Sequence, residues 1–179
     1  MPGLNKDDIV TCFAFGSKKI KRLQKKKGSS TVPEIIVKSK VFEPSRKTNN
    51  LSVSQITDLK SSGDERSIWF IGKVVEKERN ARGDPVIMAS RADISVSVIL
   101  DLKLDVIPDI PPPRHANITN FPPVDPEESY TKLQIQQKLA DKAEGFLVKE
   151  VNPEITNILN EVVSVKPEFE NYITTSPNK

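Results

Sequence analysis

The sequence contains one cysteine, one histidine and seven glycines, and each scarcity excludes a class of chemistry. A single cysteine, Cys12, can form neither an intramolecular disulfide nor a zinc site built from several thiolates. One histidine, His115, excludes zinc catalysis by several imidazoles and ribonuclease chemistry that needs two. The glycines form neither GxGxxG nor GxxxxGK[ST], the common phosphate-binding loops. We therefore expect no cofactor, no metal and a reducing, cytoplasmic location.

Long apolar runs are also missing. No segment approaches the roughly 18 apolar residues of a membrane-spanning helix, and the N-terminus lacks the apolar core of a signal peptide. A chain of 179 residues with 36% apolar residues can supply one hydrophobic core. The sequence therefore predicts one domain without membrane association, and the 28% of charged residues and 14 prolines favour loops and extended ends around it.

Positive charge is concentrated near the N-terminus. Residues 1–50 hold 12 Lys/Arg against 4 Asp/Glu, a net charge of +8, and the remainder holds 15 against 20, a net charge of −5. We interpret residues 1–32 as a basic, partly disordered arm that binds nucleic acid or an acidic protein, with a merely solubilising arm as the alternative. The candidate binding residues in the arm are Lys18, Lys19, Lys21, Arg22, Lys25, Lys26 and Lys27.

Residue patterns predict strands and a helix within a core domain at residues 33–150. The segments 34–42 (EIIVKSKVF) and 51–56 (LSVSQI) are typical of strands, and we expect them to pair. Asp64 is a suitable N-cap for a helix over residues 65–80, although a strand through SIWFIGKVV has a similar apolar pattern.

Further along the chain, apolar residues occupy every second position from Ile94 to Val106. This period of two predicts a strand with a break near Asp101, or a short helix capped by Ser95 and followed by a strand. Asp125 then begins a helix whose apolar stripe includes Leu139, and residues 151–179 form a C-terminal helix and tail.

The fold class that these elements predict is α+β. We expect one small domain with a mainly antiparallel sheet packed by two to three helices, a flexible basic N-terminal arm and a C-terminal tail.

The segment PPPRHANITNFPPVDPEE, residues 111–128, contains the single histidine. Histidine titrates near neutrality, and arginine stabilises phosphate oxygens, so a candidate catalytic set combines His115, Arg114, Arg91 and Asp93. That set suits a metal-independent nuclease of a toxin or phage-defence type. A structural alternative is that His115 bridges a loop.

A second alternative gathers Asp93, Asp105, Asp109 and His115 around a divalent cation, because carboxylates with one imidazole suit magnesium or manganese. Their spacing fixes no geometry, and aspartates that end strands and start turns explain them equally.

The segments LSVSQI, IWFIG, SRADISVS and PPPRHANITNFP resemble a recurring pattern in a family of small, uncharacterised bacterial proteins. The resemblance covers roughly residues 35–145, with Ser90 in the place of a glycine and Phe121 in that of a tryptophan. The positions that it carries over are Arg91, Asp93, Arg114, His115 and Asn117. The resemblance implies a common body and names neither a substrate nor a reaction.

Three functional hypotheses follow from the sequence. The first is a non-catalytic bacterial accessory or interaction module, which binds nucleic acid or an acidic protein through its arm and uses residues 114–117, including Asn117, as a recognition surface. The second is the nuclease that uses His115 with Arg91 and Arg114. The third is a structural subunit that docks on a larger enzyme through the helix at residues 155–163.

Overall fold

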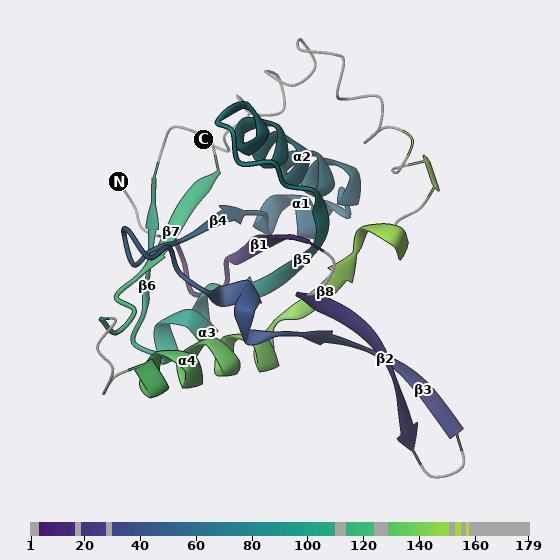
Figure 1. Ribbon diagram of the computed structural model, residues 1–179, viewed down its shortest axis with the longest axis horizontal. Coiled ribbons are helices and arrows are strands. Elements are labelled where there is room, and N and C mark those ends of the chain that lie inside the picture. The colour runs from purple at the N-terminus through teal and green to yellow at the C-terminus, as the bar shows by residue number, and fades with distance from the viewer. Residues whose placement is uncertain are drawn as a thin grey trace.

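The computed structural model describes residues 4–16, 19–27, 30–109, 114–123, 129–150, 153, 154 and 157. Within these residues, six strands form one antiparallel sheet in the order β6-β7-β4-β1-β5-β8 (Figure 1). The strands are β1 (Ile9–Phe15), β4 (Leu51–Gln55), β5 (Met88–Ser95), β6 (Asp105–Pro108), β7 (His115–Thr119) and β8 (Glu144–Leu147). The expected small α+β domain with an antiparallel sheet is confirmed.

Helices lie on both faces of the sheet, with α2 and α4 on opposite sides in Figure 1. One face carries α1 (Thr57–Ser62) and α2 (Glu65–Ala81), and the other carries α3 (Val96–Asp101), α4 (Ser129–Lys142) and the 3-10 helix η1 (Ser39–Phe42). A second 3-10 helix, η2 (Val148–Glu150), follows β8. The larger apolar core lies beneath η1, α3 and α4. No helix of the described part of the chain is long and apolar enough to cross a membrane.

The predicted helix after Asp64 is confirmed as α2. The Asp64 carboxylate accepts a hydrogen bond from the Ser67 backbone N–H at 3.0 Å, which satisfies one of the free donors at the helix start. Trp69 is only 2% exposed and packs with Phe13 and Met88 between α2 and the sheet. The tryptophan is therefore a core residue.

The two versions predicted for residues 94–106 are resolved in favour of a helix followed by a strand. Strand β5 ends at Ser95, whose hydroxyl accepts a hydrogen bond from the Ser97 N–H at 3.3 Å and so caps α3. The chain turns at Lys103, which has a φ of 62°, and continues as β6. Helix α3 makes fewer than two turns, which is too short for a helical pattern of apolar residues to appear in the sequence. The alternation of apolar residues therefore continues through it.

Two further strands, β2 (Ile20–Lys27) and β3 (Ser30–Val37), form a separate antiparallel ribbon that projects from the body (Figure 1). The predicted pairing of residues 34–42 with residues 51–56 is wrong: β3 pairs with β2, whereas β4 pairs with β1 and β7. Residues 39–42, at the end of the predicted strand, form η1 instead.

The N-terminal boundary also differs from the expected one at residue 33. Strand β1 lies inside the six-stranded sheet, between β4 and β5, so residues 9–15 belong to the core. Val10 and Cys12 face the larger core, and Phe13 faces α2. A strand buried on both faces has a nearly continuous apolar sequence rather than an alternating one, which is why its role is hard to read from the sequence. Asp125, Lys18 and most of residues 151–179 lie outside the described residues.

We predict that Gly72→Ala destabilises the protein, although alanine normally favours a helix over glycine by about 0.5–1 kcal/mol. A Cβ atom at Gly72 would meet the sulfur of Met88 and lie 2.6 Å from the Phe13 ring, so the core would be overpacked by about 1–3 kcal/mol. Urea unfolding measures the change. Arg66→Ala, an exposed substitution on the same helix, is the control and should change stability by less than about 0.5 kcal/mol. A stabilised Gly72→Ala variant would contradict this packing.

Candidate functional site

Two groups of polar side chains lie on the sheet face that carries α1 and α2. The Arg91 cluster consists of Lys60, Glu65, Arg91, Asp93 and Glu144. The His115 cluster consists of Asp58, Asp109, Arg114, His115 and Asn117. Together they contain every catalytic candidate that the sequence suggests, together with Asn117.

Arg91 on β5 is fully buried beneath α2. Its Nε donates to Asp93 at 3.1 Å, and its Nη2 donates to Asp93 at 3.2 Å and to Glu65 at 3.0 Å. The guanidinium lies 4.6 Å from the ring centroid of Trp69 and 4.3 Å from that of Phe146. Its Nη1 has no hydrogen-bond partner among the described residues. The guanidinium thus links β5 to α2 and β8 through both charge and stacking.

Lys60 on α1 completes this cluster from above. Its ammonium lies 3.0 Å from Asp93, 3.1 Å from Glu144 and 4.5 Å from the ring centroid of Phe146. Burial lowers the pKa of Lys60, but the hydrogen bonds and negative charges of Asp93 and Glu144 outweigh burial and raise it overall. Lys60 is therefore a permanent cation that holds α1 on the sheet.

This environment gives Arg91 and Asp93 structural roles. The Arg91 side chain is 0% exposed and that of Asp93 is 2% exposed, so neither reaches a phosphate in solvent. Each is already paired with an opposite charge.

Arg114 in the His115 cluster also forms an ion pair, with Asp58. Its guanidinium donates two hydrogen bonds to Asp58 on α1, at 2.6 and 2.7 Å, and its Nη1 donates to the Gln55 carbonyl at 3.4 Å. The hydrogen bonds that Arg114 donates to Asp58, together with its positive charge, lower the pKa of Asp58. Arg114 also has a φ of 64°, a left-handed conformation that costs a non-glycine residue about 1–2 kcal/mol. The ion pair helps to hold this strained turn in place.

His115 and Asn117 both close the loop that precedes β7. His115 Nδ1 lies 3.0 Å from the Asp109 carbonyl, and because a carbonyl only accepts, this contact needs the Nδ1–H form of the ring. The Asn117 amide donates to the Asp109 carboxylate at 2.8 Å, and the Asp109 N–H donates to the His115 carbonyl at 3.0 Å. The structural alternative, in which the histidine bridges a loop, accounts for these contacts.

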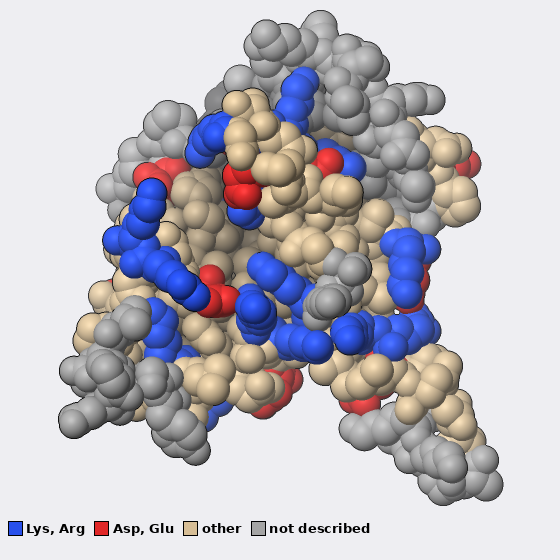
Figure 2. All heavy atoms as spheres, in the orientation of Figure 1, with Lys and Arg blue, Asp and Glu red and all other residues tan. Residues whose placement is uncertain are grey.

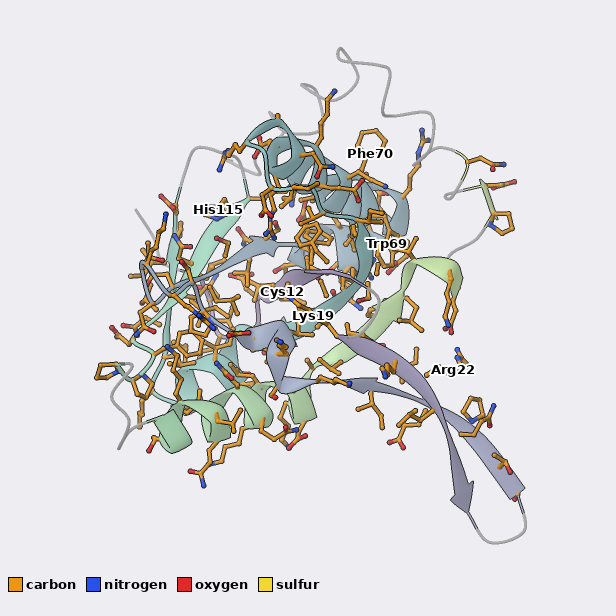
Figure 3. The ribbon with its side chains drawn as sticks, in the orientation of Figure 1. Cys12, Lys19, Arg22, Trp69, Phe70 and His115 are labelled. Carbon is orange, nitrogen blue, oxygen red and sulfur yellow. The ribbon has the colours of Figure 1, made fainter. Side chains whose placement is uncertain are left out.

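The two clusters share one row across the sheet but do not meet. Strand register places Asp93 beside Thr11, Thr11 beside Ser54, and Ser54 beside His115. Strands β1 and β4 therefore lie between Asp93 and His115, a separation of about 14 Å at about 4.8 Å per strand. In Figure 3, Trp69, against which the Arg91 guanidinium packs, lies under α2, and His115 lies on the β7 side of the sheet. The structure does not bring the four catalytic candidates together.

The carboxylates suggested for a metal are also dispersed. Asp109 lies 3.4 Å from His115, whereas Asp105 accepts a hydrogen bond from Asn120 at 2.6 Å and Asp93 belongs to the other cluster. Nowhere in the described ranges do three or more His, Cys, Asp or Glu side chains converge on a metal position. Burial raises the pKa of Cys12 to about 12, so its thiol is not an available nucleophile.

The predicted binding residues of the arm, Lys18 apart, lie on the ribbon or at its base. Residues 19–40, which comprise β2, β3 and their base and which we call the basic segment, contain eight Lys/Arg and one acid, Glu34. Their net charge is +7, and that of the rest of the chain is −4. Figure 2 shows Lys and Arg side chains in a band over the base of the ribbon. Lys19, Lys21 and Arg22 lie there, Lys25–Lys27 continue β2, and Lys18 lies outside the described residues.

The base of the ribbon packs on β8 through a close backbone approach. A Cβ atom at Gly145 would lie 2.8 Å from Val37, 2.9 Å from Ile35 and 3.1 Å from Ile20, so only glycine fits without a shift. Arg22 adds an ion pair to Glu150, with Nε 2.7 Å from the carboxylate. The hydrogen bond to Glu150 raises the pKa of Arg22. The ribbon is thus a fixed projection at its base.

Sequence reasoning did not identify Lys60, Glu65, Glu144 or Asp58. These residues come from three separate elements and match no motif, and each meets its partner only after the sheet has formed. Of the four, only Glu65 has a recognisable sequence signal, because it is an acidic residue in the first turn of a helix, directly after the capping Asp64. That signal indicates the start of a helix and not an ion pair with Arg91. No protein family, curated protein or solved structure matches this chain.

We predict that Arg91→Met destabilises the protein by about 3–5 kcal/mol, because it leaves the buried Asp93 carboxylate with Lys60 as its remaining cation. The double substitution Arg91→Met with Asp93→Leu removes both charges and should lose less stability than the single one. Urea unfolding of both variants tests this. A double variant that is less stable than Arg91→Met would contradict the assignment of the cost to the buried Asp93 charge that Arg91 no longer balances.

We also predict that the ion pair between Asp58 and Arg114 stabilises the fold only above acid pH. The pKa of Asp58 is lower in the folded protein than its ordinary value of 3.8, so its contribution is fully present above pH 3.8 and is lost as the pH falls through the folded pKa. The difference in unfolding free energy between the wild type and Asp58→Asn, about 0–1 kcal/mol at neutral pH for a partly exposed pair, should shrink as the pH falls below 3.8. Asp101→Asn, an exposed aspartate without an ion pair in the described residues, is the control. An Asp58→Asn difference that does not shrink would contradict the pair.

Proposed function

We propose that the chain is a non-catalytic, cytoplasmic module that binds nucleic acid through the basic segment. The observation that carries this proposal is the +7 charge of residues 19–40, which form a projecting ribbon and its base, against −4 for the rest of the chain. An uneven charge distribution of this kind directs a polyanion to one part of a protein. The lone buried cysteine is in keeping with a reducing compartment.

The ribbon gives the cations a defined arrangement. All eight residues of β2 are in register with β3, from Ile20 opposite Val37 to Lys27 opposite Ser30. A paired backbone fixes where each side chain begins, so fewer degrees of freedom are lost on binding than in a disordered arm. Lys21 is exposed, and Arg22 has an exposed partner in Glu150, a type of pair that contributes about 0–1 kcal/mol. A phosphate group can replace that carboxylate at little cost.

We propose a non-catalytic role because the charged groups of the two polar clusters are already paired and the clusters lie apart. Arg91 and Arg114 are both committed to carboxylates, and two strands lie between Asp93 and His115. General acid catalysis and phosphate stabilisation require groups within about 3 Å of one substrate. The side chains of His115 and Asn117 have partners within the loop that they close.

Fluorescence anisotropy with labelled nucleic acid at increasing salt tests the proposal. We expect the logarithm of the binding constant to fall linearly with the logarithm of salt concentration. Replacing Lys25, Lys26 and Lys27 together with glutamine should make the slope shallower by up to about 3, roughly one for each lost phosphate contact.

A matched control keeps the net charge equal. The control variant replaces Lys103, Lys138 and Lys142, which are exposed on the body, with glutamine. It should bind almost as the wild type does. Equal weakening by both variants would mean that the overall charge, not the ribbon, governs binding. Tighter binding of polyglutamate than of nucleic acid would favour an acidic protein as the partner instead.

A further inference from the structure

The ribbon carries cations on both of its faces. Successive residues of a strand point to opposite faces, so Lys21 and Arg22, both exposed, lie on different sides of β2. Positions 25, 26 and 27 continue the same alternation with three lysines toward the tip. A ribbon that rests flat on one strand of nucleic acid needs cations on one face only. Cations on both faces suit a ligand that surrounds the ribbon on two sides.

The basic segment also lacks any means of stacking on bases. Residues 19–40 contain no Phe, Tyr, Trp or His. Proteins that bind single strands combine positive charge with aromatic side chains on which the bases stack, and each stacked base contributes about 1–3 kcal/mol. Recognition of RNA loops relies on the same stacking. The composition of the ribbon therefore favours a ligand whose bases are already stacked in a duplex.

The dimensions of the ribbon select among duplex grooves. A β-ribbon with its side chains is about 10 Å thick, judged from the usual spacing of packed sheets. The major groove of B-form DNA is about 12 Å wide and admits a two-stranded ribbon, whereas its minor groove is about 6 Å wide. In A-form RNA the major groove is deep and too narrow for protein side chains. Among these, only the DNA major groove places a phosphate wall on each side of such a ribbon.

We infer that the ribbon binds double-stranded DNA by entering the major groove, with one face of the paired strands β2 and β3 toward each phosphate backbone. This inference rests on the proposed function. Gln24 is the single amide side chain of residues 20–37. Since contacts to phosphate carry no sequence information, we expect weak discrimination between DNA sequences.

The first test compares three labelled ligands of one sequence: double-stranded DNA, single-stranded DNA and double-stranded RNA. With the full chain at about 100 mM salt, duplex DNA should bind about tenfold more tightly than either of the others, because the others offer no groove of suitable width. Methylation by dimethyl sulfate should then be suppressed at guanine N7, in the major groove, and unchanged at adenine N3, in the minor groove.

Two single substitutions test whether both faces meet phosphate. Lys26→Gln and Lys27→Gln alter neighbouring positions on opposite faces, and each should make the salt slope shallower by about 0.9. An effect of only one of them would overturn insertion between two phosphate walls. Single-stranded DNA that binds as tightly as the duplex, or protection of adenine N3, would overturn the inference while leaving the proposed function intact. Failure to bind any nucleic acid would overturn both.

Discussion

The placement of the Arg91 guanidinium between two aromatic rings and two carboxylates is the constraint on which the fold depends. Arg91 joins β5 to α2 through Glu65 and Trp69 and to β8 through Phe146. A buried charge is tolerated only when it is paired, so these partners must assemble together. Any arrangement of α1, α2 and β8 that separates these partners would leave a buried charge with fewer of them, so the cluster opposes such arrangements.

The same constraint positions the ribbon, through β8. Phe146 stacks on Arg91 on one face of β8, and Gly145, its neighbour in sequence, accepts Val37 and Ile35 on the opposite face. An edge strand of four residues has little stability of its own. Its position between the guanidinium and the ribbon base therefore connects the buried cluster to the projecting element. Loss of the cluster would disturb the ribbon even though no residue of β2 or β3 contacts Arg91 directly in the hydrogen bonds and ion pairs described.

The sequence predicted those parts of the fold that depend on local signals. The cap at Asp64, the strand β4 and the cap at Ser95 each rest on neighbouring residues, and each is present. Strand β1 was harder to place because it is buried on both faces, and β2 because its sequence, IKRLQKKK, is mostly charged and has no apolar period. The sequence also identified polar residues of the two clusters, but it could not predict that Asp93 and His115 lie apart. The strands between them, β1 and β4, come from distant parts of the chain.

The charged residues of the body and those of the ribbon differ in how many opposite charges lie near them in the sequence and the fold. In the body, Arg91 and Arg114 form ion pairs with carboxylates of the folded chain. In the basic segment, Glu34 is the only acid among eight cations, so like charges repel one another on an isolated two-stranded ribbon, which is marginally stable in water. Anchoring at Gly145 and Glu150 offsets part of this repulsion at the base but not at the tip. A bound polyanion would offset the remainder, because a ligand that binds only the folded form stabilises it. The charge that weakens the free ribbon is thus the property on which the proposed binding of DNA depends.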